Sequence, residues 1–286
     1  MNRFAEFSAR KTRAAQEAQL HPLRTILDSA FLHPTVPAGS DWSRRLYDGP
    51  FHLWRVPPRP RPAVSLVFVQ SSEGNTGAER PADLGGGATD QHLIYEGLSR
   101  VAADAVLAGA ETAGGSDVFF SVWHPELIAL RKSLGLPRHP AQVVLTGRGR
   151  IDVDASLVFN VPDVRVFVLG TPVAQEALAE GVGSRPWVTF LTFEGDNLLP
   201  ALEQLRTEHG IRRISAVGGR KTANALLDAG VVQDIYLTTT AVSAGEPDTP
   251  LFAGSKRPNL DPVVSKRCTD PDAPFLFEHL GVYVEN

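Results

Sequence analysis

Short apolar runs recur along the chain from residue 63 onward and alternate with polar segments. The first run, AVSLVFVQ at 63–70, is almost continuously apolar and rich in β-branched and aromatic residues, which is typical of a strand covered on both faces. Similar runs predict further strands at 104–109, 141–147, 164–171, 187–193, 211–219 and 233–242. We therefore expect a sheet whose strands are mostly buried.

Helical spacing of apolar residues separates several of these runs. The pattern i, i+4, i+7 is typical of an amphipathic helix. It occurs at Ile94, Leu98 and Val101, and again at Leu198, Leu202 and Leu205. Asp196 stands where an N-cap would begin the second helix. A third helix, over 223–229, is predicted to end at Gly230 as its C′ glycine. Strands alternating with helices predict an α/β fold with a largely parallel central sheet flanked by helices.

The two ends of the chain depart from this alternation. The tail from Pro262 onward consists of strand-like runs with no helix between them, which predicts antiparallel strands at the C-terminal edge of the sheet. Residues 1–62 hold scattered aromatics, which we expect to pack either on their own domain or on a partner chain. The segment ends in a basic, proline-dense run at 57–62. Such a run fits neither a helix nor a central strand. We therefore divide the chain into an N-terminal extension with a Pro/Arg-rich linker at 1–62 and one domain at 63–286.

Composition narrows the class of protein. Of the 286 residues 43% are apolar and 21% charged, as in soluble globular proteins. The formal charge of −4 argues against a nucleic acid or an anionic membrane as the main partner. No run reaches the roughly 18 apolar residues of a membrane helix, and the N-terminus is too charged for a secretory signal. We expect a cytoplasmic protein.

Several kinds of site are excluded by missing motifs. The single cysteine, Cys268, rules out an internal disulfide and a multi-thiolate metal site, and the eight histidines never fall at HxH or HExxH spacing, so we expect no metal. A GxSxG nucleophile elbow is absent. The run GGRKT at 218–222 lacks the glycines of a phosphate-binding P-loop, and GRGR at 147–150 lacks the third glycine of a Rossmann fingerprint.

Three glycine-bearing segments follow predicted strands, where ligands bind in α/β sheets. They are 109–112, 146–150 and 218–222. Glycine lets a ligand approach the backbone, a threonine hydroxyl donates to phosphate, and Arg148 could hold the 2′-phosphate of NADPH. Glycines before a helix N-terminus suit a pyrophosphate. An ordinary turn explains each segment alone, but together they indicate a dinucleotide lying across the strand ends.

A fourth polar segment, QSSEGNTG at 70–77, follows the first strand. Its hydroxyls and its carboxylate are suitably placed to face a substrate beyond the carboxyl end of that strand. A polar turn without any ligand explains the same residues.

In the order of its motifs, the chain from about 63 to 255 resembles the reductase domain of riboflavin biosynthesis, which has a dihydrofolate-reductase-like fold. SSEG at 71–74 matches the family's Ser-x-Asp-Gly with glutamate for aspartate. The stretch from Ala103-Asp104-Ala105 to Gly109 and Thr112 matches Ala-Asp-Ala-strand-Gly-x-x-Thr. VGG at 217–219 stands at the family's Glu-Gly-Gly, and LLDAGVVQD at 226–234 is similar to the segment that follows it.

The resemblance implies NADPH-dependent reduction of the ribosyl group of 5-amino-6-(5-phosphoribosylamino)uracil to a ribityl chain. It implies a cofactor site formed by Gly109, Thr112, Thr146, Gly147, Arg148, Gly170, Thr171, Gly218, Gly219, Arg220, Lys221 and Thr222. Substrate would contact Ser71, Ser72 and Asn75, with Glu73 as the catalytic residue that donates a proton or organises water. It also implies a homodimer that acts on a small molecule.

Departures from the family pattern keep other functions open. Val217 replaces the family's glutamate, and AGGSDVFF at 113–120 replaces the family segment linked to substrate-phosphate binding, for which Arg131, Lys132 or Arg138 are possible substitutes. We expect no companion deaminase domain, since its zinc site needs two cysteines besides a histidine. The alternatives are an NADPH reductase of another heterocycle, such as a dihydropterin, and a non-catalytic nucleotide-binding protein.

Overall fold

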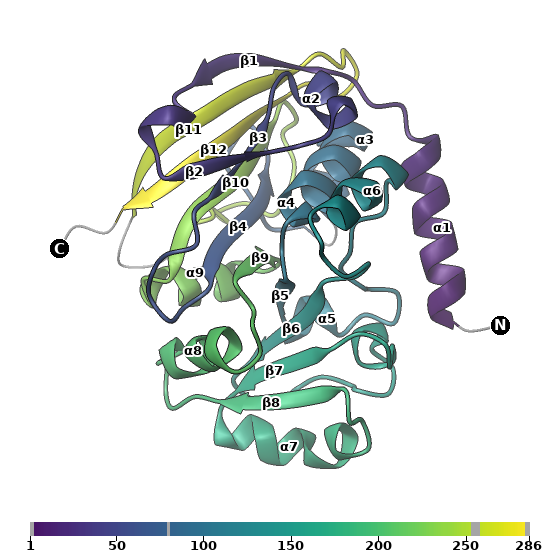
Figure 1. Ribbon diagram of the computed structural model, residues 1–286, viewed down its shortest axis with the longest axis vertical. Helices are drawn as coiled ribbons and strands as arrows, with labels where there is room; N and C mark the ends of the chain where they lie inside the picture. The colour runs from purple at the N-terminus through teal and green to yellow at the C-terminus, as the bar shows by residue number, and fades with distance from the viewer. Residues whose placement is uncertain (1–2, 79–80, 253–257, 284–286) are drawn as a thin grey trace.

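A computed structural model describes residues 3–78, 81–252 and 258–283. In this part of the chain ten strands form one sheet (Figure 1). In spatial order they are β1 (Leu23–Asp28), β11 (Asn259–Cys268), β12 (Phe275–Tyr283), β10 (Val232–Thr240), β4 (Ala63–Gln70), β9 (Arg213–Val217), β5 (Ala105–Gly109), β6 (Ala141–Thr146), β7 (Val166–Gly170) and β8 (Val188–Thr192). All strands predicted between 63 and 242 are found, with ends displaced by no more than a few residues.

The strands from β10 to β8 run parallel, as predicted. Neighbouring residues of one strand point to opposite faces, and both faces are buried: Val106 and Val67 belong to one apolar cluster, Leu107 and Leu66 to the other. Helices cover the two faces, and this two-sided burial is the reason for the continuous apolar runs.

The helices that matter for the site follow the parallel strands. They are the π-helix η3 (Asp90–Leu98), α3 (Gly87–Thr89) before it and α4 (Ser99–Val101) after it, and α5 (Ala110–Ala113), α6 (Pro125–Ser133), α7 (Pro172–Gly183), α8 (Leu199–Thr207) and α9 (Arg220–Asp228). Helices are thus confirmed at all three predicted places, and Gly230 has the left-handed φ of +63° expected of a C′ glycine. The N-cap predicted at Asp196 is wrong. Leu198 holds that position because Pro200, in the first turn, sets the helix start.

The predicted antiparallel edge is confirmed. β12 pairs antiparallel with β10 and with β11, and β1 pairs antiparallel with β11 as the outermost strand. β1 comes from the N-terminal extension, which also forms a two-stranded hairpin of β2 (Thr35–Ala38) and β3 (Phe51–Trp54) around α2 (Asp41–Tyr47). The extension therefore contributes a strand to the main sheet.

Aromatic side chains of the extension pack on the rest of the chain. Tyr47 and Phe51 contact Phe277 at ring-centroid distances of 5.7 and 6.4 Å. The helix α1 (Arg3–Glu17), at the right of Figure 1, places Phe7 5.5 Å from the Trp123 ring. The run 57–62 joins β3 to β4 without regular structure, and the boundary at residue 62 stays a prediction. Within the described ranges, no helix combines the length and the apolar character needed to cross a membrane.

Candidate active site

The glycine-bearing segments after β5 and β9 lie side by side, because β5 and β9 pair in parallel and end at the same edge of the sheet. A Cβ atom on Gly109 would come within 2.5 Å of Thr222 Oγ1, and one on Gly218 within 2.7 Å of Thr112 Oγ1. Gly218 also has a φ of +95°, which favours glycine. Gly219 N donates to Thr112 Oγ1 over 3.4 Å. The structure thus brings these five predicted residues together, and we call them the glycine–threonine cradle.

The helix α9 begins inside this cradle. Its N-cap is Gly219, and no side chain caps it. The first-turn N–H groups and the positive end of the helix dipole therefore suit an anion. Arg220 and Lys221 are the first two residues of α9, and Lys221 is exposed. α5 likewise begins at Gly109 without a side-chain cap.

The segments after β6 and β7 lie together in the same way. Thr171 Oγ1 donates to Gly147 O over 2.7 Å, and a Cβ on Gly170 would come within 3.1 Å of Thr146 O. Thr146 Oγ1 accepts from the Gly149 backbone, so both hydroxyls take part in local turns. Arg148 is exposed on the loop between them.

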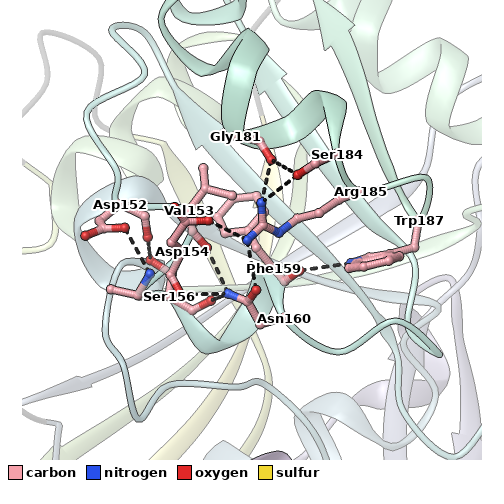
Figure 2. A network of polar contacts seen from close by, with 11 residues as sticks. Asp152, Val153, Asp154, Ser156, Phe159, Asn160, Gly181, Ser184, Arg185 and Trp187 are labelled. Atoms are coloured by element: carbon pink, nitrogen blue, oxygen red, sulfur yellow. Dashed lines mark hydrogen bonds and ion pairs between the residues drawn. The ribbon is translucent and has the colours of Figure 1, made fainter.

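A polar network holds the rest of this β6–β7 connection against α7 (Figure 2). Arg185, which follows α7, donates to Asp154 Oδ1 over 2.7 Å and to Asn160 Oδ1 over 3.0 Å. Asn160 Nδ2 in turn donates to the carbonyl oxygens of Val153 and Ser156, each over 2.8 Å. The loop that begins with Arg148 is therefore anchored at its far end.

The predicted substrate loop after β4 closes on itself. Ser71 is fully buried, its N–H donates to Asn75 O over 2.9 Å, and its Oγ accepts from Asn75 N over 3.3 Å. Gly74 has a φ of +82°, which this tight turn requires. In this arrangement Ser71 supports the loop from beneath, whereas Ser72 and Glu73 are exposed.

A second loop, 241–250 after β10, packs against the substrate loop and was not singled out from the sequence. Ser243 Oγ donates to Glu73 Oε1 over 2.7 Å, and Asn75 Oδ1 accepts from Thr249 N over 3.2 Å. Ser72 N donates to Val242 O over 3.0 Å. This loop could have been predicted as part of the site, because the strand at 233–242 was predicted and loops at the carboxyl ends of strands are candidate sites.

The buried carboxyl of Asp90 was also missed. Asp90 begins the π-helix, is 4% exposed, and accepts a hydrogen bond from Thr238 Oγ1 over 2.5 Å. Burial raises the pKa of Asp90 to about 7, although the Thr238 hydrogen bond acts in the opposite direction. Asp90 stands four residues before Ile94 and eight before Leu98, so it continues the apolar stripe of this helix. This position in the stripe could have indicated from the sequence that the aspartate is buried.

The departures from the family pattern have clear structural outcomes. Val217 is 1% exposed and belongs to the core. Arg131 donates to Ala103 O over 2.7 Å and Arg138 to Val122 O over 2.8 Å. Both arginines lie at the amino-terminal side of β5 and β6, away from the carboxyl edge where the candidate ligand loops are. The prediction that they substitute for the substrate-phosphate segment is therefore wrong. In the described ranges, no group of three or more His, Cys, Asp and Glu residues is arranged to hold a metal ion.

Fold and site together define an α/β protein of the dihydrofolate-reductase-like class, with its candidate ligand loops at the carboxyl edge of the sheet. The chain belongs to the RibD C-terminal domain family, whose model matches residues 75–270. A 2,5-diamino-6-ribosylamino-4(3H)-pyrimidinone 5′-phosphate reductase from Archaeoglobus fulgidus is 25% identical over 190 residues, which cover 66% of this chain and 85% of that protein. The resemblance to riboflavin-pathway reductases is confirmed, and it supports oxidoreductase activity.

Solved structures agree on the fold. A pyrimidine reductase-like protein from Corynebacterium diphtheriae has a TM-score of 0.55 at 20% identity, covering 78% of this chain and 93% of its own. RibD from Acinetobacter baumannii has a TM-score of 0.55 at 18% identity. The match covers 79% of this chain and 59% of that chain. The riboflavin biosynthesis reductase Rib7 of Saccharomyces cerevisiae has a TM-score of 0.53 at 15% identity. The match covers 80% of this chain and 93% of that chain.

Proposed function

We propose that this protein is an NADPH-dependent reductase of the riboflavin-pathway type, which reduces the ribosyl group of 5-amino-6-(5-phosphoribosylamino)uracil to ribityl. The observation that carries the proposal is the glycine–threonine cradle at the uncapped start of α9. The Archaeoglobus relative, named for a phosphorylated ribosylamino-pyrimidinone, supports the class of substrate.

The cradle fits a dinucleotide. Glycine at 109 and 218 lets the two loops close on each other, because a Cβ at either position would collide with Thr222 or Thr112. The uncapped N–H groups of α9 are donors for a pyrophosphate. Arg148 holds the 2′-phosphate, since a guanidinium matches phosphate oxygens bidentately. The remaining contacts come from Thr112, Thr146, Gly147, Gly170, Thr171, Gly219, Arg220, Lys221 and Thr222. When bound, NADPH supplies the hydride, and the protein orients the substrate and excludes water.

The substrate lies on the loop after β4 in this proposal. Exposed Ser72 and Glu73 and half-buried Asn75 face it, and Ser71 holds the turn that presents them. The Glu73 carboxylate, which accepts from Ser243 Oγ in the structure, accepts from substrate hydroxyls or organises a water. Ser243 thereby links the loop after β10 to substrate binding.

Thermal-shift titrations with NADPH and NADH test the cofactor part of the proposal. At about 100 times its dissociation constant a ligand adds roughly 2.7 kcal/mol of stability. We expect this shift with NADPH, and we expect Arg148→Ala to weaken NADPH binding about tenfold, which is roughly 1.4 kcal/mol, without changing NADH binding. Arg150→Ala, an exposed arginine of the same loop, is the matched control. No shift with either nucleotide would overturn the proposal.

Turnover tests the substrate part. We expect oxidation of NADPH with the phosphoribosylamino-uracil and measure the loss of reduced-nicotinamide absorbance. The buried Val217, which cannot make the contact of the family's glutamate, favours a second candidate, a reductase of another heterocycle. NADPH binding with turnover of a dihydropterin and of neither pyrimidine would establish that second function.

We further propose that the enzyme is a cytoplasmic homodimer. Exposed apolar side chains, among them Ile26 and Phe31 (56% and 83% exposed), lie at or near the outermost strand β1, and a second copy would cover them. Light scattering of the purified protein tests this part, and a monomer at micromolar concentration would contradict it.

A further inference from the structure

Two loops leave the sheet side by side at its carboxyl edge, because β4 and β10 pair in parallel and end close together. They are the substrate loop after β4 and the loop 241–250 after β10. Backbone hydrogen bonds join them at both ends: Ser72 N donates to Val242 O over 3.0 Å, and Thr76 N donates to Thr249 O over 2.8 Å. The two loops therefore form one unit, which we call the paired loops.

Thr249 fixes the far end of the paired loops. Its side chain is 5% exposed, and its Oγ1 atom accepts from Gly77 N over 3.0 Å and donates to Glu246 O over 2.5 Å. Its backbone N–H donates to Asn75 Oδ1 over 3.2 Å. A buried hydroxyl that both donates and accepts in this way holds a loop in one conformation. The stretch of chain that carries Ser243 is therefore fixed at both ends.

The side chain of Glu73 spans the gap between the two loops. Its Oε1 atom accepts from Ser243 Oγ over 2.7 Å, and its Oε2 atom accepts from Asn75 Nδ2 over a longer 3.5 Å. One partner thus belongs to each loop, and the shorter bond is the one to Ser243. Glu73 and Ser243 are both exposed, so a ligand can reach the carboxylate directly from solvent.

The pair of Glu73 and Ser243 offers hydrogen-bond acceptors only. Ser243 gives its one hydroxyl hydrogen to Glu73, so its oxygen can only accept from a ligand, and the carboxylate keeps unused lone pairs on both oxygens. Ribosyl hydroxyls are donors and match such a surface. A phosphate group accepts hydrogen bonds and carries the same charge as the carboxylate, which repels it. The pair therefore fits the sugar of the proposed substrate and not its phosphate.

The bond to Ser243 restricts a side chain that would otherwise be mobile. An exposed glutamate samples several rotamers, and ordering it when a substrate binds costs entropy. Ser243 removes part of this cost because it holds Oε1 beforehand. In the free protein the bond is open to water and adds little to stability, whereas a substrate that covers the pair excludes water and strengthens the bond. The contribution of Ser243 therefore appears in substrate binding and not in folding.

We propose that Ser243 is a positioning residue of the reductase, which acts by holding the Glu73 carboxylate towards the ribosyl hydroxyls of the substrate. This inference rests on the proposed function and makes the loop after β10 a part of the substrate site. It also gives a reason for glutamate at position 73, where the family pattern has aspartate. The Ser243 hydroxyl belongs to the neighbouring loop, and an aspartate side chain, one methylene shorter, would fall short of it.

The kinetic test compares wild type with Ser243→Ala and Ser243→Thr. We expect Ser243→Ala to raise KM for the phosphoribosylamino-uracil about tenfold with little change in kcat, as when an interaction that binds substrate is lost. Threonine keeps the hydroxyl, so Ser243→Thr should keep KM close to the wild-type value. Thermal unfolding of the ligand-free variants and their NADPH binding should be unchanged. Ser133→Ala, which changes an exposed serine of α6, is the matched control.

A double-mutant cycle shows whether Ser243 acts through Glu73. Calorimetry measures the dissociation constant of the substrate in the presence of NADP⁺, which has no hydride to give, so this readout involves no turnover. Ser243→Ala should weaken substrate binding about tenfold in the wild-type background and leave it unchanged in a Glu73→Ala background. Glu73→Asp should lose the same bond, so that Ser243→Ala adds nothing to it.

The outcomes separate this inference from the proposed function. An active wild type with an unchanged KM in Ser243→Ala would overturn the role of Ser243 and leave the proposed function standing. An equal loss of binding in the wild-type and Glu73→Ala backgrounds would also overturn it, because Ser243 would then act without Glu73. A wild type that does not reduce the phosphoribosylamino-uracil overturns the proposed function and, with it, the role of Ser243.

Discussion

Replacing Asp90 by asparagine should stabilise the protein at alkaline pH. In the folded protein the pKa of Asp90 is raised from 3.8 to about 7 because the side chain is buried. The folded state therefore holds a proton that the unfolded chain has already released between about pH 4 and pH 7, and the free energy of unfolding falls as the pH rises through that window. Asparagine cannot ionise, and its Oδ1 can still accept from Thr238.

The magnitude follows from the size of the shift. The rise from 3.8 to about 7 spans roughly three pH units, and each unit is worth about 1.4 kcal/mol. At about pH 8 the variant should therefore be more stable than wild type by up to about 4 kcal/mol, and the difference should shrink towards zero near pH 4. Such a gain is a large fraction of the total stability of a typical domain.

Urea unfolding of ligand-free protein at a series of pH values measures this difference. The denaturant slope m should be the same for both proteins, so that the midpoints report stability alone. Asp163→Asn, which changes an exposed aspartate, should show no pH-dependent gain. A difference between Asp90→Asn and wild type that stays constant across the pH range would refute the buried, protonated acid.

Two further substitutions test the framework of the site. Gly218→Ala should lower the free energy of unfolding, measured with urea, by about 1–3 kcal/mol, because φ is +95° and the new Cβ would meet Thr112 Oγ1. Gly183→Ala is its control. A Cβ at Gly183 would have no atom within 4 Å, so this variant should lose far less stability. Arg185→Ala should speed hydrogen exchange in residues 152–160 and cost about 1–2 kcal/mol through its lost bonds to Asn160 and the α7 end. Unchanged exchange in that loop would contradict the anchoring role.

The parallel half of the sheet was predictable because its strands are buried on both faces. Every residue from Ala105 to Ala108 is buried, so the run is apolar throughout and its sequence carries the signal without reference to a partner strand. The edge strand β1 behaves differently. Of its residues only Leu23 is buried, no apolar pattern marks it, and its pairing partner Cys268 lies at the other end of the chain.

The candidate site divides in the same way. Glycine, threonine and basic residues directly after apolar strands were readable from the chain, because a strand end and its loop are neighbours in sequence. The contact of Gly218 with Thr112 depends on the pairing of β5 with β9, which are far apart in sequence. The hydrogen bond between Asp90 and Thr238 likewise joins residues that are far apart in sequence.

By itself, the sequence determined the strands from residue 63 onward, the family, and the candidate chemistry of the loops after β4, β5, β6 and β9. Those properties depend on local pattern, since burial on both faces and strand–loop adjacency are visible within a few residues. Only the tertiary structure decided that the N-terminal extension completes the sheet and that Ser71 is buried while Glu73 is exposed. Burial and ionisation are set by neighbours that the chain brings together from distant positions, and a single sequence does not state those distances.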